Sequence, residues 1–315
     1  MWSRANIMGA FSFLALAAVA PMLPPWLVSL ATIAFANALV VLGLVILWRA
    51  GLVPFGQALF YAVGAYAVAL LGRYTPLRDV FLIVIAGAIC AGIVAFLIGF
   101  LLARYREIFF AMLSLAMSMI LYGILVKTES LGSTDGFHVE AGTFLGYRPQ
   151  GAMLNLALFW LVLAVGALAA FLVSLYFRST AGALAGPVRD CEIRLEFLGI
   201  SVNHLIHLKL VISGILAGAG GALAALVVAH VDPNMSYWTT SGGFVFVTVL
   251  AGAGSVAAAF VGSLVFELVR SIAIDLLPGA WQIILGSVLL LTILFLPEGL
   301  GSIVHRLRRG TEGGS

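Results

Sequence analysis

Long stretches without any charged residue restrict this chain to a small set of folds. Residues 149–177 and 210–231 contain no Asp, Glu, Lys or Arg. A helix needs about 20 apolar residues to cross the hydrocarbon of a bilayer, and backbone groups in lipid must be hydrogen-bonded within the protein. The sequence therefore predicts an all-α, polytopic transmembrane helical bundle.

The composition excludes a soluble globular protein. Hydrophobic residues make up 63% of the 315 residues and charged residues only 9%, whereas soluble domains carry about 25% charged residues. The chain has two cysteines, Cys90 and Cys191, so a disulfide framework is not expected. We expect a single transmembrane domain over residues 1–315.

Apolar runs of membrane length predict about ten spans, with roughly eight to ten as the range. Residues 5–48 are long enough for two crossings, with a break at the prolines between Pro21 and Pro25. Residues 233–277 predict a short helix near 242–251, a break at Gly252–Ser255 and a further helix. The remaining runs each predict one crossing: residues 51–72, 80–103, 108–126, 149–177, 210–229 and 281–296.

Basic residues gather on one side of this predicted topology, as they do in the cytoplasmic loops of membrane proteins. With the N-terminus inside, both termini are cytoplasmic, and the basic residues outside are Arg73, Arg78, Lys127 and Arg148. If residues 242–251 formed a re-entrant loop instead, the basic C-terminus would lie outside. The first apolar run also resembles a cleavable signal peptide, but an uncleaved first helix is preferred because later spans have the same apolar character.

A charged segment, residues 178–209, interrupts the apolar runs and must lie in water. Its charges are concentrated in a few positions: Arg189, Asp190, Glu192, Arg194 and Glu196. Pro187 suits the first turn of a helix and Gly199 suits its end, while Ile193 and Phe197 share one face. The pattern predicts a short amphipathic helix over residues 188–198 at the cytoplasmic surface. An ordinary polar connector is the alternative interpretation.

A few polar side chains fall within the predicted spans. Charges in the membrane are costly and mark functional sites by default. Glu267 and Arg270 are one helical turn apart, so we predict that they form an intramembrane ion pair. The uncharged polar residues are candidates for lining a translocation path: Asn37, Gln57, Ser114 and Ser118.

No pattern for catalysis or metal binding is complete in the sequence. Gly252–Ala257 matches the GxGxxA pattern of dinucleotide-binding folds, but the surrounding alternation of strands and helices is missing. His204 and His207 lie three residues apart without the further ligands that a zinc site needs. We expect no metal, no cofactor, no nucleic-acid partner and no enzymatic activity for this chain.

The charged segment carries a recognisable sequence, Pro187-Val188-Arg189-Asp190-Cys191-Glu192, which continues to Glu196-Phe197-Leu198-Gly199-Ile200. It resembles the cytoplasmic coupling loop of branched-chain amino acid (Liv-type) ABC transporter permeases, in particular the M-type subunit. Further motifs of that family follow in the right order: Gly51–Ala58 with Gly64–Tyr66, Tyr105–Ala116, Gly132–Gly136, Leu250–Ser255 and Phe295–Leu300. The resemblance covers about residues 49–300, although the loop has Leu195 and Phe197 where the family tends to carry small alanines.

The resemblance implies a permease subunit of an ATP-driven importer for branched-chain or other hydrophobic amino acids, working by alternating access in a bacterial inner membrane. The family pairs it with a second, H-type permease, two cytoplasmic ATPases that bind ATP and magnesium, and a periplasmic or extracellular binding protein. Related permeases for urea, short amides or sugars are alternatives, as are a secondary transporter or a channel, which need no ATPase-docking loop.

The same resemblance implies roles for two groups of residues. The loop helix would dock into an ATPase through the charged residues and the glycine at its end: Arg189, Asp190, Glu192, Arg194, Glu196 and Gly199. The binding protein would dock on the outer loops near Asp135, Gly136 and Asp232.

Overall fold

The structure, a computed structural model, is built almost entirely of helices. It describes residues 13, 16–75, 78–140, 142–144, 146–252 and 255–295. Six of the described helices are long and apolar enough to cross a membrane. These are α2 (Pro25–Trp48), α4 (Val80–Leu102), α5 (Glu107–Lys127), α6 (Ala152–Arg178), α10 (Val202–Val228) and α12 (Val256–Leu276).

Three further apolar helices complete the described part of the bundle: α3 (Gln57–Tyr74), α11 (Trp238–Ala251) and α13 (Trp281–Phe295). α11 has 14 residues, which is about 21 Å of helix against roughly 30 Å of hydrocarbon in a bilayer. The short elements are η1 (Ala20–Met22), η2 (Glu129–Leu131), η3 (Pro233–Ser236), α7 (Thr180–Ala183), α8 (Ala185–Asp190), α9 (Glu192–Phe197), β1 (Phe137–His138) and β2 (His230–Val231). The two strands pair antiparallel.

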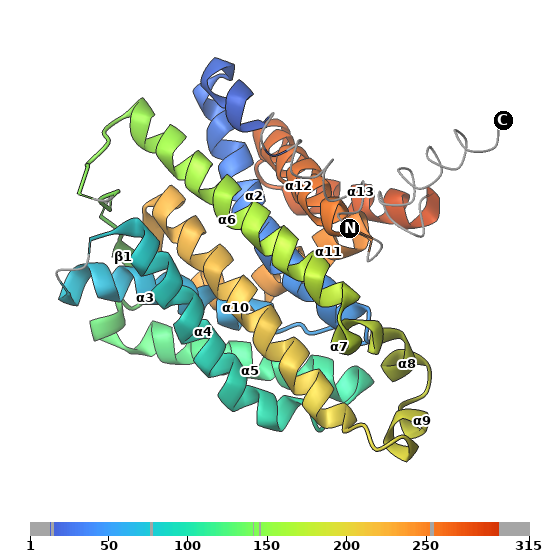
Figure 1. Ribbon diagram of the computed structural model, residues 1–315. Coiled ribbons are helices and arrows are strands. Elements are labelled where there is room, and N and C mark those ends of the chain that lie inside the picture. The colour runs from blue at the N-terminus through green and yellow to red at the C-terminus, as the bar shows by residue number, and fades with distance from the viewer. Residues whose placement is uncertain are drawn as a thin grey trace.

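α2 and α10 form the centre of the bundle. An apolar stretch of α2 is 89% buried and that of α10 is 67% buried, whereas the other four long helices reach 22% to 44%. α10 packs against α2, α3 and α4, and Figure 1 shows it running beside α4 and α6. Neighbouring helices therefore cover most sides of α2 and α10, and these two provide the core on which the others lie.

Small residues let the central helices approach closely. A Cβ added to Gly64 on α3 would overlap the backbone carbonyl of Gly218 on α10, and one added to Gly221 would overlap the carbonyl of Tyr61. Glycine at such crossings allows backbone-to-backbone contact, which drives helix association in membranes. The crossing of α3 and α10 therefore depends on the absence of side chains.

Most predicted helices are confirmed as helices. The helix predicted over residues 80–103 is α4, and the helix predicted over residues 108–126 is α5. The predicted break after residue 251 is also confirmed, because α11 ends at Ala251 and α12 begins at Val256. Within that break, Ala253 and Gly254 lie outside the described residues, as do most of the first predicted crossing and the residues from 296 to the C-terminus.

The prediction of one helix from residue 51 is wrong at its beginning. Residues 51–56 are not helical, and α3 begins only at Gln57. Pro54 disfavours the helical conformation of the residue before it, and the N–H of Phe55 donates a hydrogen bond to Ser114 Oγ at 3.1 Å instead of to a helical carbonyl. Non-helical backbone in a membrane protein is tolerated where protein groups satisfy it in this way.

Candidate functional site: the charged segment and the polar interior

The predicted loop helix is divided in two. α8 ends at Asp190 and α9 begins at Glu192, and Cys191 between them is extended, with φ of −164° and ψ of 93°. The prediction of one continuous helix over residues 188–198 is therefore wrong. The physical reason is tertiary: the break lets Glu192 form an ion pair with Arg106, 2.6 Å away, and such contacts override local helix propensity.

The predicted end of the loop helix at Gly199 is confirmed. Gly199 has φ of +79°, a conformation that glycine adopts without strain. Its N–H donates to the carbonyl of Glu196 at 2.9 Å, and the N–H of Ile200 donates to the carbonyl of Leu195 at 3.0 Å. This pair of hydrogen bonds is a Schellman motif, so Gly199 ends α9 and directs the chain toward α10.

The charged segment, residues 178–209, has one buried apolar face and another that is exposed. Val188 and Leu195 are buried, with exposures of 2% and 4%. Ile193, Phe197 and Leu198 are exposed, at 64%, 87% and 75%. The two bulky residues noted in the sequence thus differ, because Leu195 anchors α9 to the bundle whereas Phe197 points away from it.

The charged residues of the loop are mostly exposed. Arg189 and Asp190 form an ion pair with 3.3 Å between Nε and Oδ1, and both side chains are more than half exposed. Arg194 and Glu196 on α9 are also exposed. Exposed ion pairs contribute about 0–1 kcal/mol, so this pair does little to hold the loop in place.

Arg106 connects the loop to the turn between α4 and α5. Its Nε donates to Glu192 Oε1 at 2.6 Å, and one terminal nitrogen donates to Asn203 Oδ1 at 2.8 Å. The other terminal nitrogen donates to the carbonyl oxygens of Ala103 and Tyr105 at 2.6 and 3.0 Å. One guanidinium is therefore bonded to three segments: the α4–α5 turn, α9 and the first turn of α10.

Lys209 lies at the other end of the loop. Its side chain is fully buried, and Nζ donates to the Tyr176 hydroxyl at 3.2 Å and to the Ala181 carbonyl at 3.1 Å. Arg49, which follows α2, lies with its guanidinium carbon 3.9 Å from the centre of the Phe177 ring. Burial lowers the pKa of Arg49, because desolvation penalises the charged form. Two cations thus hold the last turn of α6 to α2 and α10.

Three of the four polar residues proposed for a path lie in one buried group. Gln57 Nε2 donates to Ser213 Oγ, near the middle of α10, at 2.5 Å. Ser114 accepts from the N–H of Phe55, and Ser118 donates to the carbonyl of Ser236 at 2.7 Å. These hydroxyls on α5 therefore satisfy the backbone just before α3 and at the end of η3, in the interior of the bundle.

Sequence reasoning missed two members of this group. Ser213 receives the Gln57 amide, and Ser241 accepts the N–H of Ala58 at 3.0 Å. A serine within an otherwise apolar run was the available signal for Ser213, whereas Ser241 immediately precedes the short helix predicted near 242–251. The fourth predicted residue, Asn37, lies on α2 outside these hydrogen bonds, and its buried Oδ1 has no partner among the described residues. The Oε1 of Gln57 is likewise buried without a partner there.

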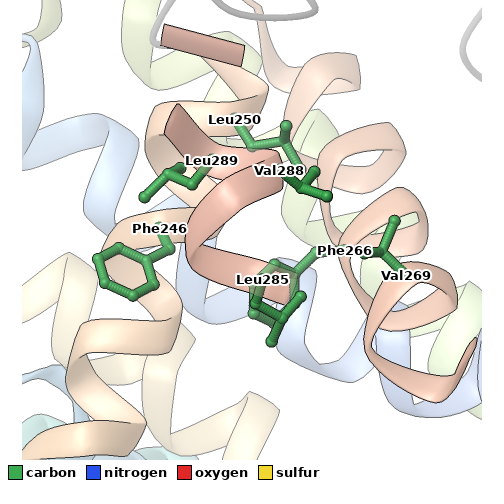
Figure 2. A pocket seen from close by; sticks show the side chains of 7 residues that line it. All are labelled: Phe246, Leu250, Phe266, Val269, Leu285, Val288 and Leu289. Carbon is green, nitrogen blue, oxygen red and sulfur yellow. The ribbon is translucent and has the colours of Figure 1, made fainter. Parts of the chain in front are cut away.

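Glu267 and Arg270 form the predicted ion pair on α12. Their Oε1 and Nη1 atoms are 3.3 Å apart, and the guanidinium also lies 5.7 Å from the centre of the Trp281 ring. The nearby junction of α11, α12 and α13 is lined only by apolar side chains, among them Phe266 and Val269 (Figure 2). A polar substrate would find no partner in that junction.

The predicted outer residues meet where β1 pairs with β2. Phe137 is opposite Val231, so Asp135 and Gly136 lie close to Asp232. Gly136 has φ of +70°, and a Cβ there would overlap the Val231 carbonyl. Asp135 is exposed, whereas Oδ1 of Asp232 accepts the N–H of Met235 at 3.2 Å and begins η3.

Comparison with known proteins supplies the context for this geometry. The family model for the "Branched-chain amino acid transport system / permease component" matches residues 26–294. The high-affinity branched-chain amino acid transport system permease protein LivM of Escherichia coli is 28% identical over 298 residues, which cover 87% of this chain and 69% of that protein. The corresponding LivH protein of Salmonella typhimurium is 25% identical over 277 residues, which cover 79% of this chain and 85% of LivH.

No solved structure matches this chain. The family model nevertheless extends from α2 to α13, and it includes the charged segment and the polar interior described above. The resemblance inferred from the loop motifs is confirmed, and the similarity to LivM fits an M-type subunit. The chain belongs to the family of branched-chain amino acid ABC transporter permeases, which are multi-pass membrane components of transport systems.

Proposed function

We propose that this chain is the M-type permease subunit of an ATP-driven importer that moves branched-chain or other hydrophobic amino acids across a bacterial inner membrane. An H-type permease, two cytoplasmic ATPases and a periplasmic or extracellular binding protein complete the complex. The ATPases bind ATP and magnesium and carry out the hydrolysis. The similarity to both LivM and LivH supports a pair of related permeases.

The exposed apolar face of α9 carries this proposal. Phe197 is 87% exposed and Leu198 is 75% exposed, on a loop that also presents charged residues. An exposed apolar patch surrounded by polar residues marks a protein-binding surface, and aromatic side chains are favoured anchors in such contacts. We propose that α9 inserts this patch into a groove of one ATPase, with the charges around it fixing the orientation: Arg189, Asp190, Glu192, Arg194 and Glu196.

In the proposed topology of about ten spans, both termini and the charged segment, which we propose is the coupling loop, are cytoplasmic. The excess of basic residues on that side supports this orientation. The β1–β2 pair then lies outside, where Asp135, Gly136 and Asp232 are available to the binding protein. Basic residues near the C-terminus, such as Arg306 and Arg308, contribute to this excess of positive charge. They lie outside the described residues.

The substrate path is proposed to pass the buried polar group. α3 begins and η3 ends beside mid-helix residues of neighbouring helices, Ser213 on α10 and Ser118 on α5. Transporters commonly place their substrate sites where helices are discontinuous in the membrane. We propose that alternating access opens this region, with Gln57, Ser114 and Ser118 nearest to the path and Asn37 further along α2.

The test is uptake of labelled leucine by proteoliposomes that contain the whole complex. We expect uptake to require ATP and the binding protein, and excess urea, acetamide or ribose to leave it unchanged. Phe197→Asp, Glu192→Lys and Arg189→Glu should each weaken ATPase association or ATP-dependent uptake. Tyr147→Asp, which changes another exposed aromatic residue outside the loop, serves as the matched control and should behave like the unaltered complex.

Three results would overturn the proposal or a part of it. Uptake that proceeds without ATP would favour a secondary transporter or a channel. If the three loop variants retained both ATPase association and ATP-dependent uptake, the loop would not be the coupling element. Competition by urea, amides or sugars would instead assign the chain to a related importer with another substrate.

A further inference from the structure

The hydrogen bonds of Arg106 indicate how a displacement of the coupling loop is transmitted to a neighbouring helix. We propose that Arg106 is a positioning residue that transmits movement of α9 to α5, while Lys209 keeps the other end of the loop fixed to the central helices. The inference deepens the proposed function and rests on it, because it requires ATPases that move α9.

Arg106 is unusually well suited to transmit a displacement. A guanidinium has five N–H donors in a rigid plane, and four hydrogen bonds from Arg106 reach Glu192, Asn203 and two carbonyls of its own turn. Bonds to charged partners are shorter and stronger than neutral ones, and the Arg106–Glu192 pair is only 26% and 33% exposed. A shift of α9 must therefore either break these bonds or move the beginning of α5.

α5 is the helix best able to respond. Only 22% of its apolar stretch is buried within this chain, against 89% for α2. Its first residue, Glu107, has φ of +50°, which is disfavoured for a residue with a Cβ. The start of α5 is thus held by the contacts of Arg106 rather than by the preference of its own backbone.

Lys209 makes the other end of the loop a fixed point. It joins α10 to Tyr176 at the end of α6 and to Ala181 in α7. α10 packs against α2, α3 and α4, so this end of the loop belongs to the central body of the bundle. Because this end of the loop is fixed, a force on α9 displaces the other end of the loop toward the segment that joins α4 to α5.

Movement of α5 would reach the polar interior directly. The hydroxyl of Ser114 holds the N–H of Phe55, and that of Ser118 holds the carbonyl of Ser236. Both serines lie on α5, whereas their partners precede α3 and α11. The chain of contacts therefore runs from α9 through Arg106 and α5 to the buried group that we propose lies on the substrate path.

The experiment measures substrate transported per ATP hydrolysed in the reconstituted complex. Arg106→Glu should lower this ratio about tenfold, since a strong charge-assisted contact becomes a repulsion, while ATPase association and ATP hydrolysis persist. Arg106→Lys keeps a cation beside Glu192 and leaves Glu192 itself unchanged, so it should lower the ratio less than Arg106→Glu does. Arg104→Ala, a change at an exposed arginine in the same turn, is the matched control and should leave the ratio unchanged.

The outcomes separate this inference from the proposed function. If the unaltered complex fails to take up leucine with ATP, the proposed function fails. If the unaltered complex transports and an assembled Arg106→Glu complex has an unchanged ratio, only the role of Arg106 is refuted. Where Arg106→Glu prevents assembly, Arg106→Gln takes its place: a normal ratio for Arg106→Gln contradicts the inference, and a lowered ratio without loss of ATPase activity supports it.

Discussion

α2 and α5 are apolar helices of similar length, 24 and 21 residues, yet they are placed very differently. The apolar stretch of α2 is 89% buried and that of α5 only 22%. α2 is held by close packing against α10, α6 and α12, whereas α5 is held by hydrogen bonds at particular points: Arg106 at its start and two serines along its length.

This difference separates a rigid body from an element that can be moved. Close-packed interiors tolerate little change of shape, so α2, α3, α4 and α10 are suited to serve as a frame. A helix attached by a few polar contacts can shift when one contact is displaced. In the mechanism that we propose, the frame keeps the fold while α5 responds to the coupling loop.

The largest effect should follow from adding side-chain atoms where α3 and α10 cross in close contact. Gly64→Val places side-chain atoms where the Gly218 carbonyl lies, and neither backbone can yield cheaply. We expect a loss of about 3 kcal/mol or more, seen as a lower thermal unfolding midpoint and less inserted protein. Gly72→Val on the same helix is the control, because a Cβ there meets nothing within 4 Å. Equal losses from both changes would remove the argument for a close-packed frame.

The next largest effect should be the difference in stability lost when a side chain is shortened on α2 and on α5. Leu39→Ala on α2 removes a fully buried side chain and should cost about 2–5 kcal/mol. Met112→Ala on α5, where the side chain is 65% exposed, should cost less than about 1 kcal/mol because little packing is lost. Unfolding of the purified complex in detergent measures both. A cost for Met112→Ala equal to that for Leu39→Ala would show that α5 belongs to the frame.

The buried hydrogen bonds should have intermediate importance. Ser213→Ala leaves the Gln57 amide without its partner in a fully buried position, which should cost about 1–3 kcal/mol. The hydroxyl of Ser287 bonds only to a carbonyl of its own helix and is exposed, so Ser287→Ala should stay within about 0.5 kcal/mol. Thermal unfolding midpoints compare the two. No difference between these serine variants would argue against a structural role for the polar interior.

The smallest expected effect concerns the strained start of α5. Glu107→Gly removes the steric cost of a φ of +50° and should raise stability by up to about 1 kcal/mol. Glu129→Gly, in a 3-10 turn without this strain, should lower it slightly by increasing the entropy of the unfolded chain. A loss of stability for Glu107→Gly as large as that for Glu129→Gly would mean that Glu107 is not strained.

The long charge-free runs predicted the helices well, because apolar length in a membrane depends only on local sequence. α4, for example, differs by one residue from the run that predicted it, residues 80–103. Charge-free runs predicted helix wrongly where backbone groups form hydrogen bonds with residues distant in the sequence. Residues 51–56 are apolar enough for a span, yet Ser114 rather than a helical carbonyl receives the N–H of Phe55.

The candidate site was predictable to a similar degree. Gly199 marked the end of the loop helix through its own conformational freedom, and Glu267 with Arg270 followed from helical spacing. The break at Cys191 could not be foreseen, because it accompanies a contact between Glu192 and Arg106, which are 86 residues apart in the sequence. Partners this distant depend on the completed fold.

The comparison between frame and moving helix is tested most directly by distances between spin labels in the complete complex. One pair joins Met112 on α5 to Leu172 on α6, and the control pair joins Ile89 on α4 to Leu172; all three side chains are exposed. Trapping ATP on hydrolysis-deficient ATPases should change the first distance and leave the second unchanged. If the control distance changes as much as the first, or if the α5 distance stays constant while ATP is bound, this account of the permease is contradicted.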